Sequence, residues 1–166
     1  LEASHNWMRG NARSFERAVR AIGLAARSPL NFDVVTCVNK KNLPELPQLH
    51  GLLVSLGVKQ WRLFTIIPIG RAAGEADLHL TDGQFVSLME FIREKRQEGG
   101  PMKTTFSCEG YLGRYEEQVR DVRYFCHAGV NIASILIDGR ICACPNIDRD
   151  VFSEGDIYRD SLWEVW

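Results

Sequence analysis

The chain has 166 residues, of which 45% are hydrophobic and 25% charged, and its formal net charge is −1. This composition predicts a globular protein and gives no basic surplus for nucleic acid or an anionic membrane. The longest apolar runs, such as residues 63–69, are too short to span a bilayer, so we expect a cytoplasmic protein. In that compartment, five cysteines favour thiols or metal ligands over disulfides.

The first half of the chain alternates helix and strand patterns. Apolar residues at helical spacing predict a helix capped by Ser14 that runs to about Arg27. The β-branched run from Phe32 to Val38 predicts a strand covered on both faces. Asn42 is a candidate cap for the next helix, whose regular turns we expect to be delayed until Pro47.

The alternation continues to the middle of the chain. Residues 61–67 predict a second strand, Thr81 and Gln84 form a capping box for a third helix, and residues 103–107 predict a third strand. Three strands with right-handed crossovers predict an incomplete parallel β/α sheet, like part of a TIM barrel, with helices on its outer face. The inner face and a strand edge would stay bare, so we expect self-association through these strands.

Polar residues follow the strands where ligands of α/β proteins bind, at the carboxyl ends. Asn39 follows the first strand, and Arg71 follows the second with a planar fork suited to a carboxylate or phosphate. Both are candidate cofactor-binding residues, and the alternative is an ordinary solvated loop. The pair Glu116-Glu117 and the run 93–96 are interpreted as solvated helix faces.

The second half carries the cysteine pattern C-x12-G-x4-C, formed by Cys126, Gly139 and Cys144. Runs 130–137 and 140–143 predict a hairpin with a type I′ turn at Asp138-Gly139, followed by Pro145, so the flanking cysteines can lie close together. Two thiolates at the open end of a hairpin suit a soft metal or an iron–sulfur cluster.

The other three cysteines are either further candidate ligands or structural residues. Cys108 is the candidate third ligand, because residues 115–124 can fold back as one helical excursion. Cys142 lies inside the regular strand arm and is expected to point away or only substitute, and Cys37 is expected to be buried core packing. The alternative for all of these cysteines is that they act as small buried hydrophobes.

Two sets of motifs indicate a family resemblance. The second half contains Phe125-Cys126-His127-Ala128-Gly129, Ile135 to Ile141, Ala143-Cys144-Pro145, Gly155-Asp156-Ile157-Tyr158 and Leu162 to Trp166. The first half contains Arg9-Gly10, Ser14-Phe15-Glu16-Arg17-Ala18, Val38-Asn39-Lys40-Lys41-Asn42 and Pro68-Ile69-Gly70-Arg71-Ala72. On these motifs, residues 108–166 resemble the start of a SPASM domain, the C-terminal auxiliary-cluster domain of radical S-adenosylmethionine (SAM) enzymes, and residues 1–107 resemble the second half of the radical-SAM partial barrel. The resemblance is greatest to the subgroup encoded beside small lipoproteins in Bacteroidetes-type bacteria.

The resemblance implies an oxidoreductase or maturase whose catalytic [4Fe-4S] cluster cleaves SAM to a 5′-deoxyadenosyl radical that acts on a peptide or other small substrate. It also implies an auxiliary [4Fe-4S] cluster on Cys108, Cys126 and Cys144, and a rim at Asn39 and Arg71 that faces SAM. The C-x3-C-x2-C loop of the catalytic cluster does not occur in this sequence. We therefore expect a fragment that is inactive by itself and holds no catalytic residue.

Two other functions stay open. The first is a non-catalytic zinc- or iron–sulfur-binding α/β module, in which the cysteine hairpin is structural. The second is a binding protein with unliganded thiols. Both ends of the chain, at Leu1 and at Trp166, have the pattern of a sequence cut from a longer one.

Overall fold

The computed structural model describes residues 1–166, which form two compact units, Leu1–Tyr124 and Phe125–Trp166. The division follows Tyr124, whereas the resemblance places a functional boundary after residue 107; that boundary stays a prediction. No helix in the chain combines the length and the apolar composition that crossing a membrane requires.

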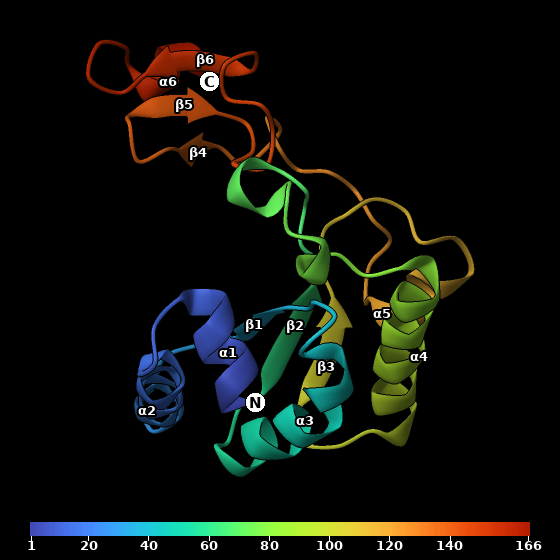
Figure 1. The fold of residues 1–166 in the computed structure, drawn as a ribbon. Helices are drawn as coiled ribbons and strands as arrows, with labels where there is room; N and C mark the ends of the chain where they lie inside the picture. The colour runs from blue at the N-terminus through green and yellow to red at the C-terminus, as the bar shows by residue number, and fades with distance from the viewer. The chain divides into compact units, whose positions relative to one another are not determined.

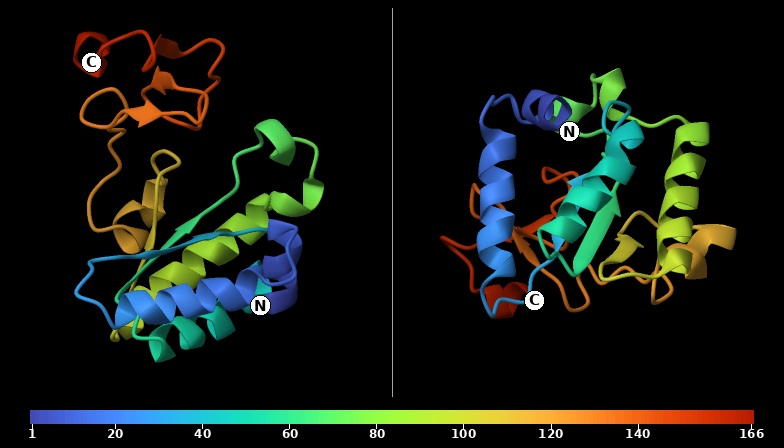
Figure 2. Two further views of the ribbon diagram at one scale, coloured as in Figure 1. Left: turned by 90° about the vertical axis from the view of Figure 1, so that its left-hand side faces the viewer. Right: turned by 90° about the horizontal axis from the view of Figure 1, so that it is seen from below.

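The first unit is built on a parallel sheet in the order β1-β2-β3, as predicted (Figure 1). The strands are β1 (Val34–Cys37), β2 (Gln60–Phe64) and β3 (Lys103–Phe106), and Leu63 of β2 pairs with Thr36 and with Phe106. Helices α3 (Leu46–Ser55) and α4 (Asp82–Glu98) connect the strands and cover one face of the sheet (Figure 2). The fold is therefore α/β with an open sheet.

The helices begin largely where local sequence signals place them. Thr81 and Gln84 form the predicted capping box of α4. A 3-10 turn, η1 (Leu43–Glu45), comes before α3, whose regular turns begin at Leu46 with Pro47 in the first turn. Ser14 begins α2 (Ser14–Ala26) without capping it, because its hydroxyl lies 3.1 Å from His5 Nε2 of α1 (Glu2–Arg9).

The core lies between the sheet and the helices α3 and α4. Trp61 and Leu63 project from β2 and are fully buried, and Phe91 of α4 meets the Trp61 ring edge-on with centroids 6.0 Å apart. Burial of such large apolar side chains is the main stabilising contribution to a unit of this kind. The other members of the cluster are Val38, Leu46, Leu53, Val58, Leu88, Met89, Ile92, Met102, Phe106, Tyr115 and Val119.

The prediction that residues 32–38 form a strand covered on both faces is wrong. β1 is an edge strand that pairs only with β2, and its residues alternate between half-buried and exposed. Val35 is 45% exposed, and Cys37 is exposed instead of buried in the core. The reason is topological, since helices cover only one face and no strand of this unit lies beyond β1.

The short segment after β3 corrects a second expectation. It contains η4 (Gly113–Tyr115) and α5 (Glu116–Val119), which cover the first part of the helical excursion predicted for residues 115–124, whereas residues 120–124 are not helical. Glu116 is 2% exposed and is not part of a solvated face, unlike its neighbour Glu117. Arg96, within the run 93–96, also turns inward and donates to the carbonyls of Thr104 and Arg120.

The second unit is a small antiparallel sheet in the order β4-β5-β6, followed by a short helix. Its elements are β4 (Ser134–Ile135), β5 (Arg140–Cys142), β6 (Ser153–Asp156) and α6 (Leu162–Val165). The predicted hairpin between β4 and β5 is confirmed, but the predicted type I′ turn at Asp138-Gly139 is wrong. Gly139 donates to the Leu136 carbonyl at 2.9 Å and has φ 89°, whereas Asp138 keeps a negative φ. This is a turn closed by a left-handed glycine, not a type I′ turn.

Candidate cofactor and cysteine sites

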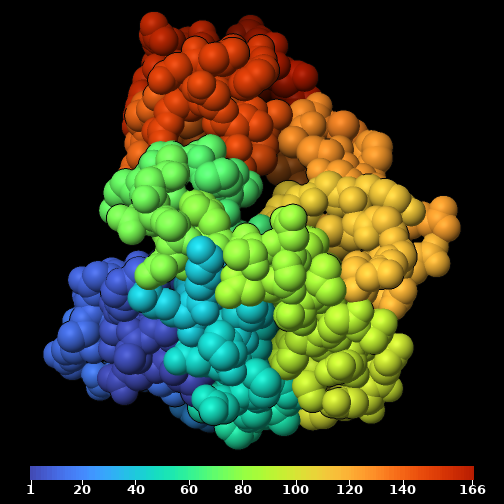
Figure 3. Space-filling view, turned by 45° about the vertical axis from the view of Figure 1, so that its right-hand side comes forward, coloured from blue at the N-terminus to red at the C-terminus, as the bar shows by residue number.

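The carboxyl ends of β1, β2 and β3 lie at one edge of the parallel sheet, so the residues that follow the strands gather there. Asn39 follows β1, Thr65 follows β2 and Cys108 follows β3. The loop from β2 to α4 also starts at this edge and contains Arg71. Residues of about 66–80 form the green lobe beside α3 and α4 in the space-filling view (Figure 3).

Asn39 is fully buried, and its side chain is occupied by its own loop. Its Oδ1 accepts from the backbone N–H groups of Lys41 at 2.9 Å and Asn42 at 3.0 Å, and its Nδ2 lies 3.5 Å from the Met8 sulfur. Asn42 returns the contact by accepting from the Asn39 N–H at 2.8 Å. Asn39 thus shapes the loop after β1, and a contact with a cofactor stays a prediction.

Arg71 is exposed, and no hydrogen bond or ion pair holds its guanidinium. It lies in η2 (Gly70–Ala72), where Gly70 has φ 56°. His79 fixes this loop, since its ring nitrogens lie 3.2 Å from the Ile66 carbonyl oxygen and 2.7 Å from that of Ala72. The guanidinium is therefore free to bind an anion from an anchored loop, and its role as a cofactor ligand stays a prediction.

Glu109 is a site residue that the sequence did not reveal. Its carboxylate accepts from the Thr65 N–H at 2.9 Å and from the Thr65 hydroxyl, so it joins the loop after β3 to the end of β2. Although Cys37 is exposed as a residue, its thiol is partly shielded from water, which raises the pKa of the thiol; the Glu109 carboxylate raises this pKa further, and Arg9 lowers it. A glutamate between Cys108 and Gly110 carries no periodic signal, so only the fold could place it.

Glu116 and Arg120 form a buried ion pair behind this loop. The Arg120 Nη1 lies 2.9 and 3.0 Å from the two carboxylate oxygens, and Arg120 is 7% exposed. Burial alone would raise the pKa of Glu116, but N–H groups of Leu112 and Tyr124 and the Arg120 guanidinium outweigh it and lower the pKa. The carboxylate therefore stays charged.

The cysteines of the second unit occupy three different environments. Cys126 is exposed, Cys144 is half-buried, and Cys142 is buried with its thiol 3.4 Å from the Cys144 carbonyl oxygen. A Cβ built on Gly129 would lie 3.5 Å from that of Ala143, so the segment after Cys126 runs beside the end of β5.

The sulfur of Cys144 accepts a backbone N–H, from Asn146, at 3.4 Å. Such N–H···S bonds stabilise thiolates that bind metals and clusters, so the environment of Cys144 fits a ligand. No group of three or more His, Cys, Asp or Glu side chains has a metal-binding arrangement in the structure. The joint site of Cys108, Cys126 and Cys144 stays a prediction.

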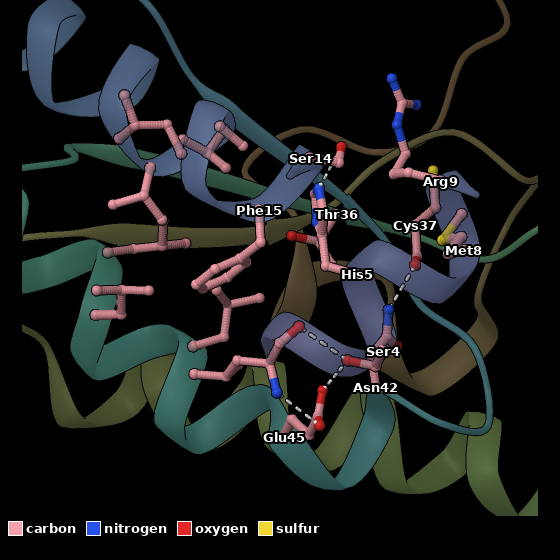
Figure 4. Close-up of a pocket in the computed structure, with 18 of the residues that line it drawn as sticks. Ser4, His5, Met8, Arg9, Ser14, Phe15, Thr36, Cys37, Asn42 and Glu45 are labelled. Atoms are coloured by element: carbon pink, nitrogen blue, oxygen red, sulfur yellow. Dashed lines mark hydrogen bonds and ion pairs between the residues drawn. The ribbon is translucent and has the colours of Figure 1, made fainter. Parts of the chain in front are cut away.

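A cavity of about 320 Å³ lies between α1, α2, β1 and α3 (Figure 4). Most of the wall is apolar. Polar side chains of α1, α2 and β1 also line the cavity, and among them His5 Nε2 lies 3.1 Å from the Ser14 hydroxyl. Of the apolar stripe on α2, only Ile22 packs against the core cluster. The cavity follows from the free edge of β1, because no strand fills the space under α2. Wall residues include Phe15, Val19, Val34, Leu49 and Leu53.

No protein-family model matches the chain. It is similar to the AdoMet-dependent heme synthase of Nitratidesulfovibrio vulgaris, with 28% identity over 99% of this chain and 48% of the relative. The protein of the same name from Oleidesulfovibrio alaskensis is 27% identical over 98% of this chain and 45% of its own length. That from Methanosarcina barkeri is 25% identical over 57% of this chain and 27% of its own length.

The chain is thus a distant homologue of AdoMet-dependent heme synthases, and it spans about half the length of the first two curated relatives.

Proposed function

We propose that this chain is part of a radical SAM enzyme, in which residues 1–107 contribute the second half of the partial barrel and residues 108–166 contribute an auxiliary iron–sulfur site. The observation that supports the proposal most is the alignment of almost the whole chain with AdoMet-dependent enzymes. The open parallel sheet is consistent with it, since the chain supplies three parallel strands and no closed barrel.

The residues present fit parts of such a site. Arg71, exposed and unpaired on an anchored loop, would bind the carboxylate of SAM, and Asn39 would hold the loop after β1 against the cofactor. Cys108, Cys126 and Cys144 would ligate the auxiliary [4Fe-4S] cluster, with the Asn146 N–H supporting the Cys144 thiolate. The cofactors, when bound, would supply hydrogen-atom abstraction from the substrate.

The relatives bear on the substrate. All three are named heme synthases, which favours a tetrapyrrole over the peptide that the SPASM resemblance implies. We therefore propose that the substrate is a tetrapyrrole, and a peptide is the alternative. Neither the fold nor the exposed loop at Arg71 distinguishes them, so the choice rests on the relatives.

The test compares this chain with the longer protein that contains it. Both are reconstituted with iron and sulfide in the absence of oxygen, reduced with dithionite in the presence of SAM, and assayed for 5′-deoxyadenosine. We expect product from the longer protein and none above a no-protein control from this chain, because this chain lacks the C-x3-C-x2-C loop. Added iron-porphyrin precursor should increase product formation, whereas an added peptide should not.

Two outcomes would contradict the proposal. Product from this chain alone would show that the catalytic cluster is inside it. A longer protein that binds zinc or iron through the three cysteines but forms no 5′-deoxyadenosine would favour the non-catalytic metal-binding module.

A further inference from the structure

The loop after β3 has a backbone conformation that its sequence does not favour. Cys108, Glu109 and Gly110 have φ values of 58°, 65° and 77°, and the first two are the only non-glycine residues of the chain with positive φ. An L-residue with a side chain is strained in this region, so surrounding contacts must hold the loop.

Arg120 supplies those contacts. Its guanidinium donates to the carbonyl oxygens of Cys108 and Gly110, the latter at 2.8 Å, and so clamps both ends of the left-handed segment. The guanidinium also lies over the rings of Phe106 and Tyr124, 5.5 and 5.2 Å from their centroids. Only the planar fork of arginine can bond two carbonyls and stack on two rings at once.

Glu116 fixes Arg120 in turn. The carboxylate binds the guanidinium, and it also accepts the N–H of Leu112 at 2.8 Å and the N–H of Tyr124. Leu112 follows the strained loop closely in the sequence, and Tyr124 is the last residue of the first unit. The pair therefore ties the loop to the last residues of this unit from a buried position.

The conformation that Arg120 holds also places Glu109 beside the residue that follows β2. With the loop in this conformation, Cys108 is exposed and the Glu109 carboxylate reaches the N–H and hydroxyl of Thr65 after β2. Thr65 forms its side-chain hydrogen bonds with Glu109 and none with Arg120 or Glu116. An effect of Arg120 on Thr65 would therefore have to pass through the loop.

We propose that Arg120, held by Glu116, is a positioning residue for the carboxyl end of the sheet: it fixes the Cys108–Gly110 loop so that the thiol of Cys108 and the carboxylate of Glu109 are preorganised there. The purpose of this arrangement, to present a cluster ligand and a fixed anion beside the cofactor, rests on the proposed function. The arrangement itself does not depend on that function, because it rests on the contacts of Arg120, Glu116 and Glu109.

Amide hydrogen exchange of Thr65, followed by NMR on this chain, tests the positioning directly. Arg120→Lys keeps the positive charge but removes the planar guanidinium that bonds both loop carbonyls. We therefore expect exchange of the Thr65 amide to become about tenfold faster, while the amides of the β1–β2 and β2–β3 ladders keep their exchange rates. Arg123→Lys is the matched control, because Arg123 forms an exposed ion pair with Glu117 in the same segment. It should leave Thr65 unchanged.

A second variant covers the risk that Arg120→Lys unfolds the segment. Arg120→Met combined with Glu116→Gln removes both charges and leaves no unpaired ion buried, so the ladder amides should stay protected while Thr65 exchanges faster. Unchanged Thr65 exchange in either variant, with the ladder intact, would overturn the inference.

A separate measurement distinguishes this inference from the proposed function. In the longer protein reconstituted with iron and sulfide, Arg120→Lys should lower the auxiliary-cluster signal in electron paramagnetic resonance spectra, as Cys108→Ala should, whereas Arg123→Lys should not. Faster Thr65 exchange in a protein whose wild type forms no auxiliary cluster would support the positioning and contradict the proposed function.

Discussion

Gly139 shows how one residue can decide a local structure. Its φ of 89° lies where a side chain is strained, and a Cβ there would contact the Tyr158 ring, 2.7 Å from Cδ2, and lie 3.3 Å from an Asp156 oxygen. The glycine of the C-x12-G-x4-C pattern is therefore required by backbone conformation and by close approach, not by a type I′ turn.

We expect Gly139→Ala to destabilise the second unit by about 1–2 kcal/mol, the cost of a left-handed alanine. Tyr158 is 80% exposed and can move away, so removing its ring with Tyr158→Ala should restore only a minor part. Hydrogen exchange of the β5 amides measures the effect, and Gly74→Ala, in open space without a positive φ, is the control. Equal exchange in both variants would contradict this account.

Glu116 gives the chain a pH dependence. Its folded-state pKa lies below the ordinary 4.5, so its contribution to stability is fully present above about pH 4.5 and is lost as the pH falls through the folded value. At pH 7, Glu116→Gln leaves Arg120 buried without a counter-charge, which we expect to cost about 3 kcal/mol.

The difference between wild type and Glu116→Gln should therefore be large at pH 7 and shrink in acid, as thermal unfolding at several pH values can show. Glu117→Gln changes the same residue type on the exposed neighbour and should have little effect at any pH. A constant difference between Glu116→Gln and wild type across the acid range would mean that the carboxylate is not the stabilising form.

At the scale of elements, local signals were sufficient wherever the cause was local. The capping box at Thr81, the delay of regular helix until about Pro47 and the existence of the three strands follow from residues close in sequence. The exposure of Cys37 and the burial of Glu116 do not, because each depends on what the fold places beside it. A Glu-Glu pair looks the same in sequence whether Arg120 lies behind one member or not.

In the candidate site, too, features with a local cause could be predicted from the sequence and features with a distant cause could not. The position of Asn39 at a strand end could be predicted, because a polar residue follows a β-branched run. Its burial could not, since it results from bonds to its own loop, which compete with any ligand. Glu109 and Arg120 were missed because their partners, Thr65 and the Cys108 carbonyl, are distant in sequence or belong to the backbone.

In the first unit as a whole, the free edge of β1 is the least satisfied feature. All three strands were expected to be able to mediate self-association. β2 is the central strand and has no open edge, so it cannot pair with another chain. At β3, Arg96 donates to the Thr104 carbonyl and Lys103 pairs with Asp121, which occupies that side. β1 keeps an unpaired edge beside an apolar cavity, and such edges pair with other chains.

We therefore expect this chain to self-associate through β1 into a dimer or larger assembly, which light scattering over a range of concentrations would detect. Val35→Lys places a charge on the edge strand and should favour the monomer. Val86→Lys is the matched control, because Val86 on α4 is 41% exposed, close to the 45% of Val35, and lies on no strand. A wild-type monomer at high concentration, or equal effects of the two lysines, would show that the β1 edge is not the contact.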